Sequence, residues 1–591
     1  MTTRPHDGER TGARAVVETL AALGVDTVFG LPGVHNLALW RELAESPLRL
    51  VGVRHEQAAA YAADGYARAS GRLGVALVTS GPGAANTLAA VGEAGASHSP
   101  VVVIATDVPL ALRRPGVVRG LLHESRDQCA LFEPLVKRAE DVAAADALAT
   151  AVERAARTAL AAPSGPVYVG VPADLLDAPA GAGTLASADA LEASAAAPDE
   201  SGDAAAEGET ASRAVAVAAG LLRGAARPLI WSGGGAAHAG AGGVIARLAE
   251  LLAAPVLTTY QGRGILPPEH PCAVPGPAHA PEVGALWDAA DVVLAVGSDL
   301  DAMMTQNWRM PRPPSLVALN VDAADASKNW APDVLIEADA RAGVQALVDL
   351  LEGGAARGAA VARGADAEAA NDPPGRESPA ALATRLGEIG DAVRARIAAD
   401  EPQALLLLDA LARGLPPEAL IVCDMCIPGY WIGGFHPVPA PRRLAYPVGW
   451  GTLGFAFPAA LGAAFAHDGP TLCVAGDGGF LMACGELATA AQERIPLTVL
   501  LFDDGGYGML RFDAQRARSA PFGVDLASPD FVMLARSFGI DAEHVALDAL
   551  APALASHIAR PEPSMIVVAA RLRPPPTTSP RWYRTAQEEP V

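Results

Sequence analysis

Short apolar, β-branched runs alternate with longer Ala/Leu-rich segments along the whole chain. The first third contains the runs GVALVTS, PVVVIAT and GPVYVGVP, and the last third contains TLCVAGDGG, PLTVLLFDD and SMIVVAA. Continuous apolar strands that alternate with helical segments are typical of parallel sheets covered by helices on both faces. The pattern therefore predicts an α/β protein of doubly wound parallel-sheet domains, in which ligands bind at the carboxyl ends of the strands.

Two acidic, Ala-rich segments without apolar periodicity divide the 591 residues into three blocks. Their composition, at residues 179–211 and 353–378, is typical of interdomain linkers. We expect an N-terminal domain over residues 10–178, a central domain over 212–352, a C-terminal domain over 379–572 and a tail over 573–591. Each of the three blocks has the size of an ordinary domain.

Composition argues against several classes of function. The formal net charge of −22 argues against a nucleic-acid partner, because such binding needs clustered Lys and Arg. No uninterrupted apolar run approaches the roughly 18 residues that indicate a membrane span, and the first 20 residues lack the apolar core of a secretory signal. Six cysteines are too few for a disulfide scaffold, so we expect a cytoplasmic protein with no membrane partner.

Two strand-like runs end in aspartates that are set among glycines. Asp477 lies between Gly476 and the pair Gly478 and Gly479, and Asp504 ends the next run along the chain. Adjacent parallel strands place such ends side by side, and glycines before a helix, expected from about residue 480, let the backbone approach an anion. Two carboxylates beside an anion site predict a Mg²⁺–diphosphate site, the alternative being an ordinary turn and an ordinary strand end.

The chain resembles the thiamine diphosphate (ThDP, or thiamine pyrophosphate) enzymes, in the group that contains acetolactate synthase, benzoylformate decarboxylase and pyruvate oxidase. The GDG at 476–478 followed by a paired motif at 503–504 is the family's signature. Local similarity to 5-guanidino-2-oxopentanoate decarboxylase-like members comes from LLHESRDQCAL and GVDLASPDF. The resemblance covers nearly the whole chain, including VFGLPGVHNLALW (28–40), RHEQAAAYAADGYAR (54–68), SGPGAANT (80–87), GRGILPPEHP (262–271) and GWGTLGFAFPAALGA (449–463).

The resemblance implies that the N-terminal domain binds the pyrimidine of the cofactor and the C-terminal domain binds its diphosphate. The domain between them corresponds to the family's central domain. Glu56 would hydrogen-bond the aminopyrimidine ring, and His35 and His123 would flank the cofactor mouth as catalytic groups, although either histidine could equally be a capping or core residue. Mg²⁺ would bind Asp477, Asp504 and the carbonyl of Gly506. The implied cofactor contacts are Pro32, Gly33, Glu56, Gly451, Leu453, Gly476, Asp477, Gly478, Gly479, Asp504, Gly506 and Tyr507.

The chain departs from the family pattern at several positions. Asp503 and Asp504 stand where two Asn are usual, which adds negative charge beside a diphosphate. Asp299 stands where flavin-binding members carry Arg, so we expect no FAD. Asp513 stands where acetolactate synthases place a Trp, and it could pair with a cationic substrate side chain. The substrate pocket implied in this way contains Thr79, Gly81, Met509 and Asp513.

The resemblance implies a ThDP- and Mg²⁺-dependent enzyme that acts on a small 2-oxo acid. Decarboxylation through a cofactor ylide and enamine would give an aldehyde, or the acyl-anion unit would pass to a carbonyl acceptor as in acetolactate synthase. The family arrangement implies a homodimer or homotetramer with active sites at the subunit interface. The alternative is a catalytically silent regulatory homologue, which the presence of Glu56, Asp477 and Asp504 disfavours.

Overall fold

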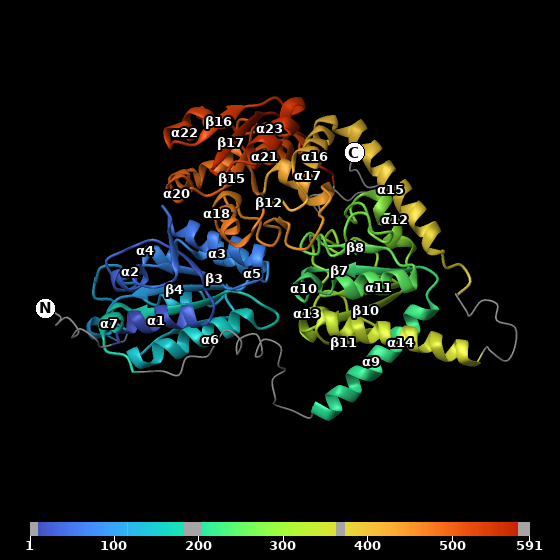
Figure 1. Cartoon of the computed structure of the whole chain (residues 1–591), viewed down its shortest axis with the longest axis horizontal. Coiled ribbons are helices and arrows are strands. Elements are labelled where there is room, and N and C mark those ends of the chain that lie inside the picture. Colours follow the sequence, from blue (N-terminus) through green and yellow to red (C-terminus); the bar gives the residue numbers. More distant parts are fainter. Residues whose placement is uncertain (1–9, 115, 182–203, 362–372, 577–591) are drawn as a thin grey trace. The chain divides into compact units, whose positions relative to one another are not determined.

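In the computed structural model, residues 10–114, 116–181, 204–361 and 373–576 are described. They form three parallel-sheet α/β domains, which confirms the predicted fold class (Figure 1). The chain divides into two compact units: one spans Met1–Pro198, Glu418–Cys426 and Ala445–Arg571, and the other spans Asp199–Pro417, Ile427–Leu444 and Leu572–Val591. The predicted linkers and tail fall partly on residues 182–203, 362–372 and 577–591, outside the described residues, and the predicted boundaries stay predictions.

The N-terminal sheet belongs to the first unit and has the strand order β2-β1-β3-β4-β6-β5, with every pairing parallel. Its strands are β1 (Thr27–Gly30), β2 (Arg49–Gly52), β3 (Gly74–Val78), β4 (Val101–Asp107), β5 (Arg138–Asp141) and β6 (Val167–Pro172). Its helices are α1 (Gly12–Ala22), α2 (Leu37–Ala44), α3 (Glu56–Ser70), α4 (Pro82–Ala85), α5 (Leu88–Ala96), α6 (Leu148–Leu160) and α7 (Ala173–Asp177).

Strand β4 shows why these runs are apolar at every position. All seven of its residues are buried, because side chains alternate between the two covered faces of the sheet. Val102 and Ile104 join a core with α1 and α6, whereas Val101 and Val103 join a second core with α3. Figure 1 shows α1 and α6 on one side of this sheet and α3 and α5 on the other.

The C-terminal sheet completes the first unit, with strand order β13-β12-β14-β15-β17-β16. Its strands are β12 (Leu420–Cys423), β13 (Leu444–Ala445), β14 (Thr471–Gly476), β15 (Leu497–Asp503), β16 (Asp541–His544) and β17 (Ser564–Ala569). Its helices are α18 (Ala456–Ala466), α19 (Asp477–Leu481), α20 (Leu487–Glu493), α21 (Gly508–Arg516), α22 (Phe531–Ser537) and α23 (Leu550–Ile558).

The helix after the GDG motif begins earlier than the sequence predicts. We expected it from about Phe480, but α19 starts at Asp477, with Gly476 in the N-cap position. A carboxylate in the first turn is favourable at the positive end of a helix. The side chain of Asp477 also accepts the N–H of Gly478 at 2.9 Å, which stabilises this start.

The second unit contains the middle sheet, with strand order β11-β10-β9-β7-β8 and parallel pairing throughout. No helix among the described residues is both long enough and apolar enough to span a bilayer. The strands are β7 (Pro228–Ser232), β8 (Val256–Thr258), β9 (Val292–Val296), β10 (Ser315–Asn320) and β11 (Val334–Glu337). The helices are α9 (Ala204–Gly224), α10 (Gly234–His238), α11 (Gly242–Leu252), α12 (Pro281–Ala289), α13 (Ala323–Ser327), α14 (Ala340–Val361), α15 (Pro379–Asp400), α16 (Pro402–Gly414) and α17 (Ile427–Phe435).

Helices α3 and α18 join the two sheets of the first unit at a contact made of small residues. A Cβ atom on Gly65 would lie 1.9 Å from the backbone oxygen of Ala459, and one on Gly462 would lie 1.8 Å from that of Ala62. Only glycine allows the two helix backbones to approach so closely. This contact matters for the site, because α3 begins at Glu56 and α18 follows directly after the segment that contains Leu453.

Candidate functional site

Buried and half-buried aspartates lie at the carboxyl ends of β14 and β15. Asp477 is only 1% exposed, and burial raises its pKa. The hydroxyl of Ser528 lies 3.2 Å from Oδ2 of Asp477 and 3.2 Å from Oδ1 of Asp503. One hydroxyl carries one proton, so it can donate to only one of these carboxylates at a time. Asp477 and Asp503 therefore compete for one hydroxyl proton, and each also accepts a backbone N–H, from Gly478 and Gly505.

Asp504 has the features of a cation ligand. Its Oδ1 is buried and has no hydrogen-bond partner within the described residues, and Nη1 of Arg511 lies 3.7 Å away. Burial and the neighbouring charge of Asp477 raise the pKa of Asp504 to about 6. A divalent cation between two such carboxylates would supply the missing positive charge. Because the described residues contain no group of three or more metal-binding side chains, the other ligands would be backbone or phosphate oxygens.

The loop after β15 leaves no space for a side chain at Gly506, or at Gly478 of the neighbouring α19. Gly506 has φ of 143°, and a Cβ atom there would lie 2.1 Å from the backbone oxygen of Val524, which also accepts the N–H of Tyr507 at 2.8 Å. A Cβ atom on Gly478 would lie 2.7 Å from the ring of Tyr507. The structure thus packs Gly478 of α19 against the loop after β15, which contains Gly506 and Tyr507.

Asp424 is a site residue that the sequence reasoning missed. It follows β12, is 1% exposed, and accepts N–H groups from Met425 at 2.9 Å and from Gly454 at 3.1 Å. Burial raises the pKa of Asp424 to about 6. A Cβ atom on Gly479 would lie 2.9 Å from its carboxylate, so Asp424 ties the segment after Leu453 to the GDG turn. The available signal was the run ALIVCD, which also ends in an aspartate.

A buried acid from the N-terminal domain holds the segment before Leu453. Glu93 on α5 is fully buried, and its Oε2 accepts N–H groups from Trp450 at 3.2 Å and Gly451 at 3.1 Å. Its Oε1 accepts from Nη2 of Arg68 at 3.2 Å, and Arg68 also pairs with Asp64 at 2.8 Å. Gly451 has φ of +69°, a left-handed conformation that favours glycine. Glu93 therefore fixes the backbone that is predicted to contact the pyrimidine.

Glu56 is the first residue of α3 and is 8% exposed. Its Oε2 accepts a hydrogen bond from Nδ2 of Asn86 at 3.0 Å, a partner that the sequence reasoning did not identify. The start of the helix is held from the C-terminal domain, because Oε1 of Glu486 accepts the N–H groups of Arg54 at 2.9 Å and His55 at 3.1 Å. The carboxylate of Glu486 thus fixes the backbone directly before Glu56, and both residues belong to the first unit.

Thr79 lies between two glycines next to Glu56. A Cβ atom on Gly33 would lie 2.5 Å from Oγ1 of Thr79, and one on Gly83 would lie 2.7 Å from its Cγ2 and 3.3 Å from Oε1 of Glu56. Oγ1 of Thr79 is buried without a hydrogen-bond partner in the described part of the chain. The structure therefore brings together Gly33 and Glu56, predicted as cofactor contacts, and Thr79, predicted as a pocket residue, with the exposed Pro32 directly before Gly33.

His35 and His123 lie together although 88 positions separate them in number. Their rings meet edge to face with centroids 5.4 Å apart, and the hydroxyl of Ser80 lies between their Nδ1 atoms. Burial and the nearby His123 lower the pKa of His35. Gly81 contacts the same segment, because a Cβ atom there would lie 2.5 Å from the backbone oxygen of His123.

Two residues of the predicted substrate pocket, Met509 and Asp513, lie on α21. They lie one turn apart, which puts them on the same face of that helix. Within the described residues, no hydrogen bond or ion pair links Glu56 to Asp477 or Asp504.

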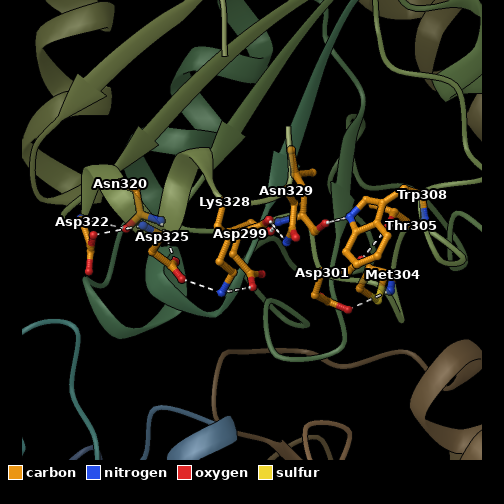
Figure 2. A network of polar contacts seen from close by, with 12 residues as sticks. Asp299, Asp301, Met304, Thr305, Trp308, Asn320, Asp322, Asp325, Lys328 and Asn329 are labelled. Atoms are coloured by element: carbon orange, nitrogen blue, oxygen red, sulfur yellow. Dashed lines mark hydrogen bonds and ion pairs between the residues drawn. The ribbon is translucent and has the colours of Figure 1, made fainter. Parts of the chain in front are cut away.

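Asp299 belongs to a polar network at the carboxyl ends of β9 and β10 in the middle domain (Figure 2). Nζ of Lys328 lies 2.8 Å from Oδ2 of Asp299 and 2.7 Å from Oδ1 of Asp325. Nδ2 of Asn329 donates to the backbone oxygen of Asp299 at 2.9 Å. This acidic residue is thus paired with a cation of its own domain, and the expectation that FAD is absent stays a prediction.

Three family models of thiamine pyrophosphate enzymes match the chain. The N-terminal TPP-binding domain matches residues 10–131, the central domain matches residues 215–347, and the C-terminal TPP-binding domain matches residues 426–568. Each match falls on one of the three parallel sheets.

Curated relatives are similar over almost the whole chain. A probable 2-ketoarginine decarboxylase of Pseudomonas aeruginosa is 35% identical over 90% of this chain and 88% of its own. Probable acetolactate synthase large subunits are 29% identical in Methanococcus aeolicus and 30% identical in Methanocaldococcus jannaschii, each over 90% of this chain and 87% of their own.

Proposed function

Because the chain belongs to the thiamine pyrophosphate enzyme family, among decarboxylase and acetolactate synthase-like members, we propose that it is a Mg²⁺- and ThDP-dependent enzyme that acts on a 2-oxo acid. The observation that carries the proposal is Oδ1 of Asp504, which is buried, accepts no hydrogen bond within the described residues and lies beside the buried Asp477. Burying carboxylate oxygens without hydrogen bonds is costly, and a Mg²⁺–diphosphate would offset that cost.

We propose that separate groups of residues would hold the metal ion, the diphosphate and the pyrimidine of the cofactor. Asp477, Asp504 and the backbone oxygen of Gly506 would hold Mg²⁺, and the backbone at Gly478 and Gly479 would contact the diphosphate. The backbone at Gly451 and the side chain of Leu453 would hold the pyrimidine edge and the folded cofactor. When bound, ThDP supplies the carbanion at which the carbon chemistry of a 2-oxo acid takes place.

Glu56 has the placement of a group that orients a cofactor proton. It is buried, and among the described residues its side chain makes one hydrogen bond, from Asn86 to Oε2, while Oε1 lies beside Gly83. A carboxylate there would hold a proton on the aminopyrimidine ring and select the tautomer that accepts one. His35 and His123 would exchange protons with the substrate-derived group, which in a decarboxylase ends as an aldehyde.

We propose that the active site is completed between two copies of the chain, as a homodimer or homotetramer. The proposal is supported by the resemblance, because in the family the glutamate that Glu56 matches and the GDG site meet across a subunit interface. Two copies would let Glu56 of one chain face the acid cluster of the other. A cytoplasmic location is supported by the six cysteines, all of which carry free thiols.

The substrate is proposed to be a 2-oxo acid whose side chain Asp513 can contact. One relative is named a 2-ketoarginine decarboxylase, and 2-ketoarginine is 5-guanidino-2-oxopentanoate, which carries a cationic end. A carboxylate on α21 is a suitable partner for a guanidinium group, since Arg-type groups form paired hydrogen bonds with carboxylates. Acetolactate synthase-like capture by a carbonyl acceptor stays open beside simple aldehyde release.

The test measures CO₂ release by the full chain with ThDP and Mg²⁺ on a panel of guanidino and alkyl 2-oxo acids. Mass spectrometry of the products separates an aldehyde from an acyloin or other condensation product. We expect turnover of at least one 2-oxo acid, and we expect Asp513→Asn to lower the rate on guanidino substrates relative to alkyl ones. No CO₂ from any member of the panel would favour the regulatory homologue, and equal relative rates in Asp513→Asn would remove that residue from the pocket.

A further inference from the structure

Ser80 connects the two histidines of the proposed site. It follows β3, is fully buried, and its Oγ lies 2.5 Å from Nδ1 of His35 and 3.1 Å from Nδ1 of His123. His35 follows β1, and His123 lies in the segment between β4 and β5, so three separate parts of the N-terminal domain converge on one hydroxyl. The sequence reasoning quoted Ser80 within SGPG but gave it no role.

The number of available protons limits how these three groups can bond. A serine hydroxyl has one proton to donate, and a neutral imidazole carries a single N–H on one of its two nitrogens. Oγ of Ser80 has no other hydrogen-bond partner among the described residues. If both Nδ1 atoms donated to Oγ, the buried hydroxyl proton would be left unpaired, which is unfavourable for a buried donor. The neutral triad is satisfied when one Nδ1 donates and the other accepts.

Hydrogen bonds of the buried Gln128 connect the segment that carries His123 to the backbone beside Ser80. His123 has φ of +67°, and the N–H of Gly81 donates to Oε1 of Gln128 at 2.6 Å. Gln128 is 2% exposed and donates from Nε2 to the backbone oxygen of Thr106 at 2.9 Å and to the hydroxyl of Tyr168 at 2.7 Å. The amide thus fixes the loop that faces the two rings, and the ring positions are built into the fold.

The surroundings of His35 favour its neutral state. Asp107 at the end of β4 acts in the opposite direction by raising the pKa of His35, but Nη2 of Arg113 pairs with its carboxylate at 2.7 Å. Asp127 is exposed to solvent. Burial and the proximity of His123 lower the pKa of His35, because two imidazolium rings at this distance would repel each other.

We propose that Ser80 is a positioning residue that holds His35 and His123 in opposite tautomers. One ring then presents an N–H donor at Nε2 and the other presents a lone pair at Nε2. Neither Nε2 atom has a partner among the described residues, and neither is a buried atom without a partner, so both can reach a ligand. The inference rests on the proposed function for its chemistry, but the tautomers are a property of the protein alone.

The opposite tautomers form a one-proton relay. The ring with Nε2–H gives that proton to the substrate-derived group and takes the hydroxyl proton of Ser80 at Nδ1. The oxygen of Ser80 takes the Nδ1 proton of the other ring, which in turn binds a solvent proton at Nε2. One proton enters, one leaves, and the two histidines exchange roles. A substrate can therefore be protonated without a charged histidine pair at any stage before or after the transfer.

Nitrogen NMR of the full chain labelled with ¹⁵N-histidine tests the tautomers directly near pH 8. His35→Gln and His123→Gln identify the two sets of ring signals. We expect one ring protonated at Nδ1 and the other at Nε2 in the wild-type protein, and loss of this opposition in Ser80→Ala. The same tautomer on both rings of the wild type, or an unchanged pattern in Ser80→Ala, would overturn the proposal.

Kinetics supply the second readout, with Ser99→Ala as the matched control. Ser99 is also buried, at 2% exposed, and its Oγ has no hydrogen-bond partner within the described residues. We expect Ser80→Ala to lower kcat by roughly 10-fold or more with KM changed less than about 2-fold, and to move the acid limb of the pH profile. We expect Ser99→Ala to behave as wild type. Equal effects of the two variants would contradict a positioning role, whereas an inactive wild type would refute the proposed function and leave the NMR result to decide on Ser80.

Discussion

Gly65→Ala is expected to destabilise the first unit by separating the two helices that join its sheets. The added Cβ atom would lie 1.9 Å from the backbone oxygen of Ala459, at least 1 Å closer than carbon and oxygen tolerate, and a backbone atom cannot rotate away. Overpacking typically costs about 1–3 kcal/mol, and this contact lies at the upper end or beyond. Alanine regains about 1 kcal/mol of helix propensity. The net loss is therefore about 2 kcal/mol or more.

Thermal unfolding of the full chain without added cofactor measures this loss. About 2 kcal/mol corresponds to a fall in Tm of roughly 4 °C. Gly387→Ala is the matched control, because Gly387 lies within α15 and a Cβ atom there meets nothing within 4 Å. We expect the control to leave Tm unchanged or to raise it slightly. A Gly65→Ala protein as stable as the wild type would refute the close helix contact, and with it the placement of Glu56 relative to α18.

Three further perturbations have defined outcomes. Glu93→Gln is expected to weaken ThDP binding roughly 10-fold by calorimetry, because charged hydrogen bonds to the backbone at Gly451 are lost, and unchanged affinity would contradict that role. Asp504→Asn is expected to keep Mg²⁺-dependent ThDP binding and tighten it a few-fold by removing charge beside the diphosphate; weaker binding would show that the second carboxylate is needed. Burial lowers the pKa of His436 to about 4, so the unfolded chain alone binds that proton between pH 6.5 and 4. The free energy of unfolding in urea should fall by about 3 kcal/mol over that range, a component that His436→Gln should lose, and equal pH dependence in both proteins would argue against the shift.

The sequence predicted the parts of the site that local pattern encodes. Asp477 and Asp504 each follow an apolar run, and the order of parallel strands puts β14 and β15 side by side, as the register from Thr471 to Gly476 confirms. The backbone has no space for a side chain at positions 478 and 506, so glycine is required there. These glycines were therefore visible in the sequence beside the aspartates. These features depend on neighbours within a few residues, or on one strand pairing.

The parts that were missed depend on contacts between distant segments. Glu93 sits in an Ala-rich helix and resembles any helical glutamate until its contact with Gly451, more than 350 positions away, is known. Asp424 is followed by Met rather than Gly, so it lacked the pattern that marked Asp477. Ser80 gained a role only from the folding of His35 against it. Local pattern contains no information on such partners.

Calorimetric titration of the full chain with ThDP, in Mg²⁺ and then in excess EDTA, tests the central claim most directly. Asp477→Ala removes the buried carboxylate at the GDG turn, and Asp530→Ala removes an exposed N-cap aspartate of α22 as the control. We predict Mg²⁺-dependent ThDP binding by the wild type and by Asp530→Ala, and at least roughly 10-fold weaker binding by Asp477→Ala. A wild-type chain that ignores ThDP, or an Asp477→Ala variant that binds it equally well, would contradict the assignment of this cluster as the cofactor site.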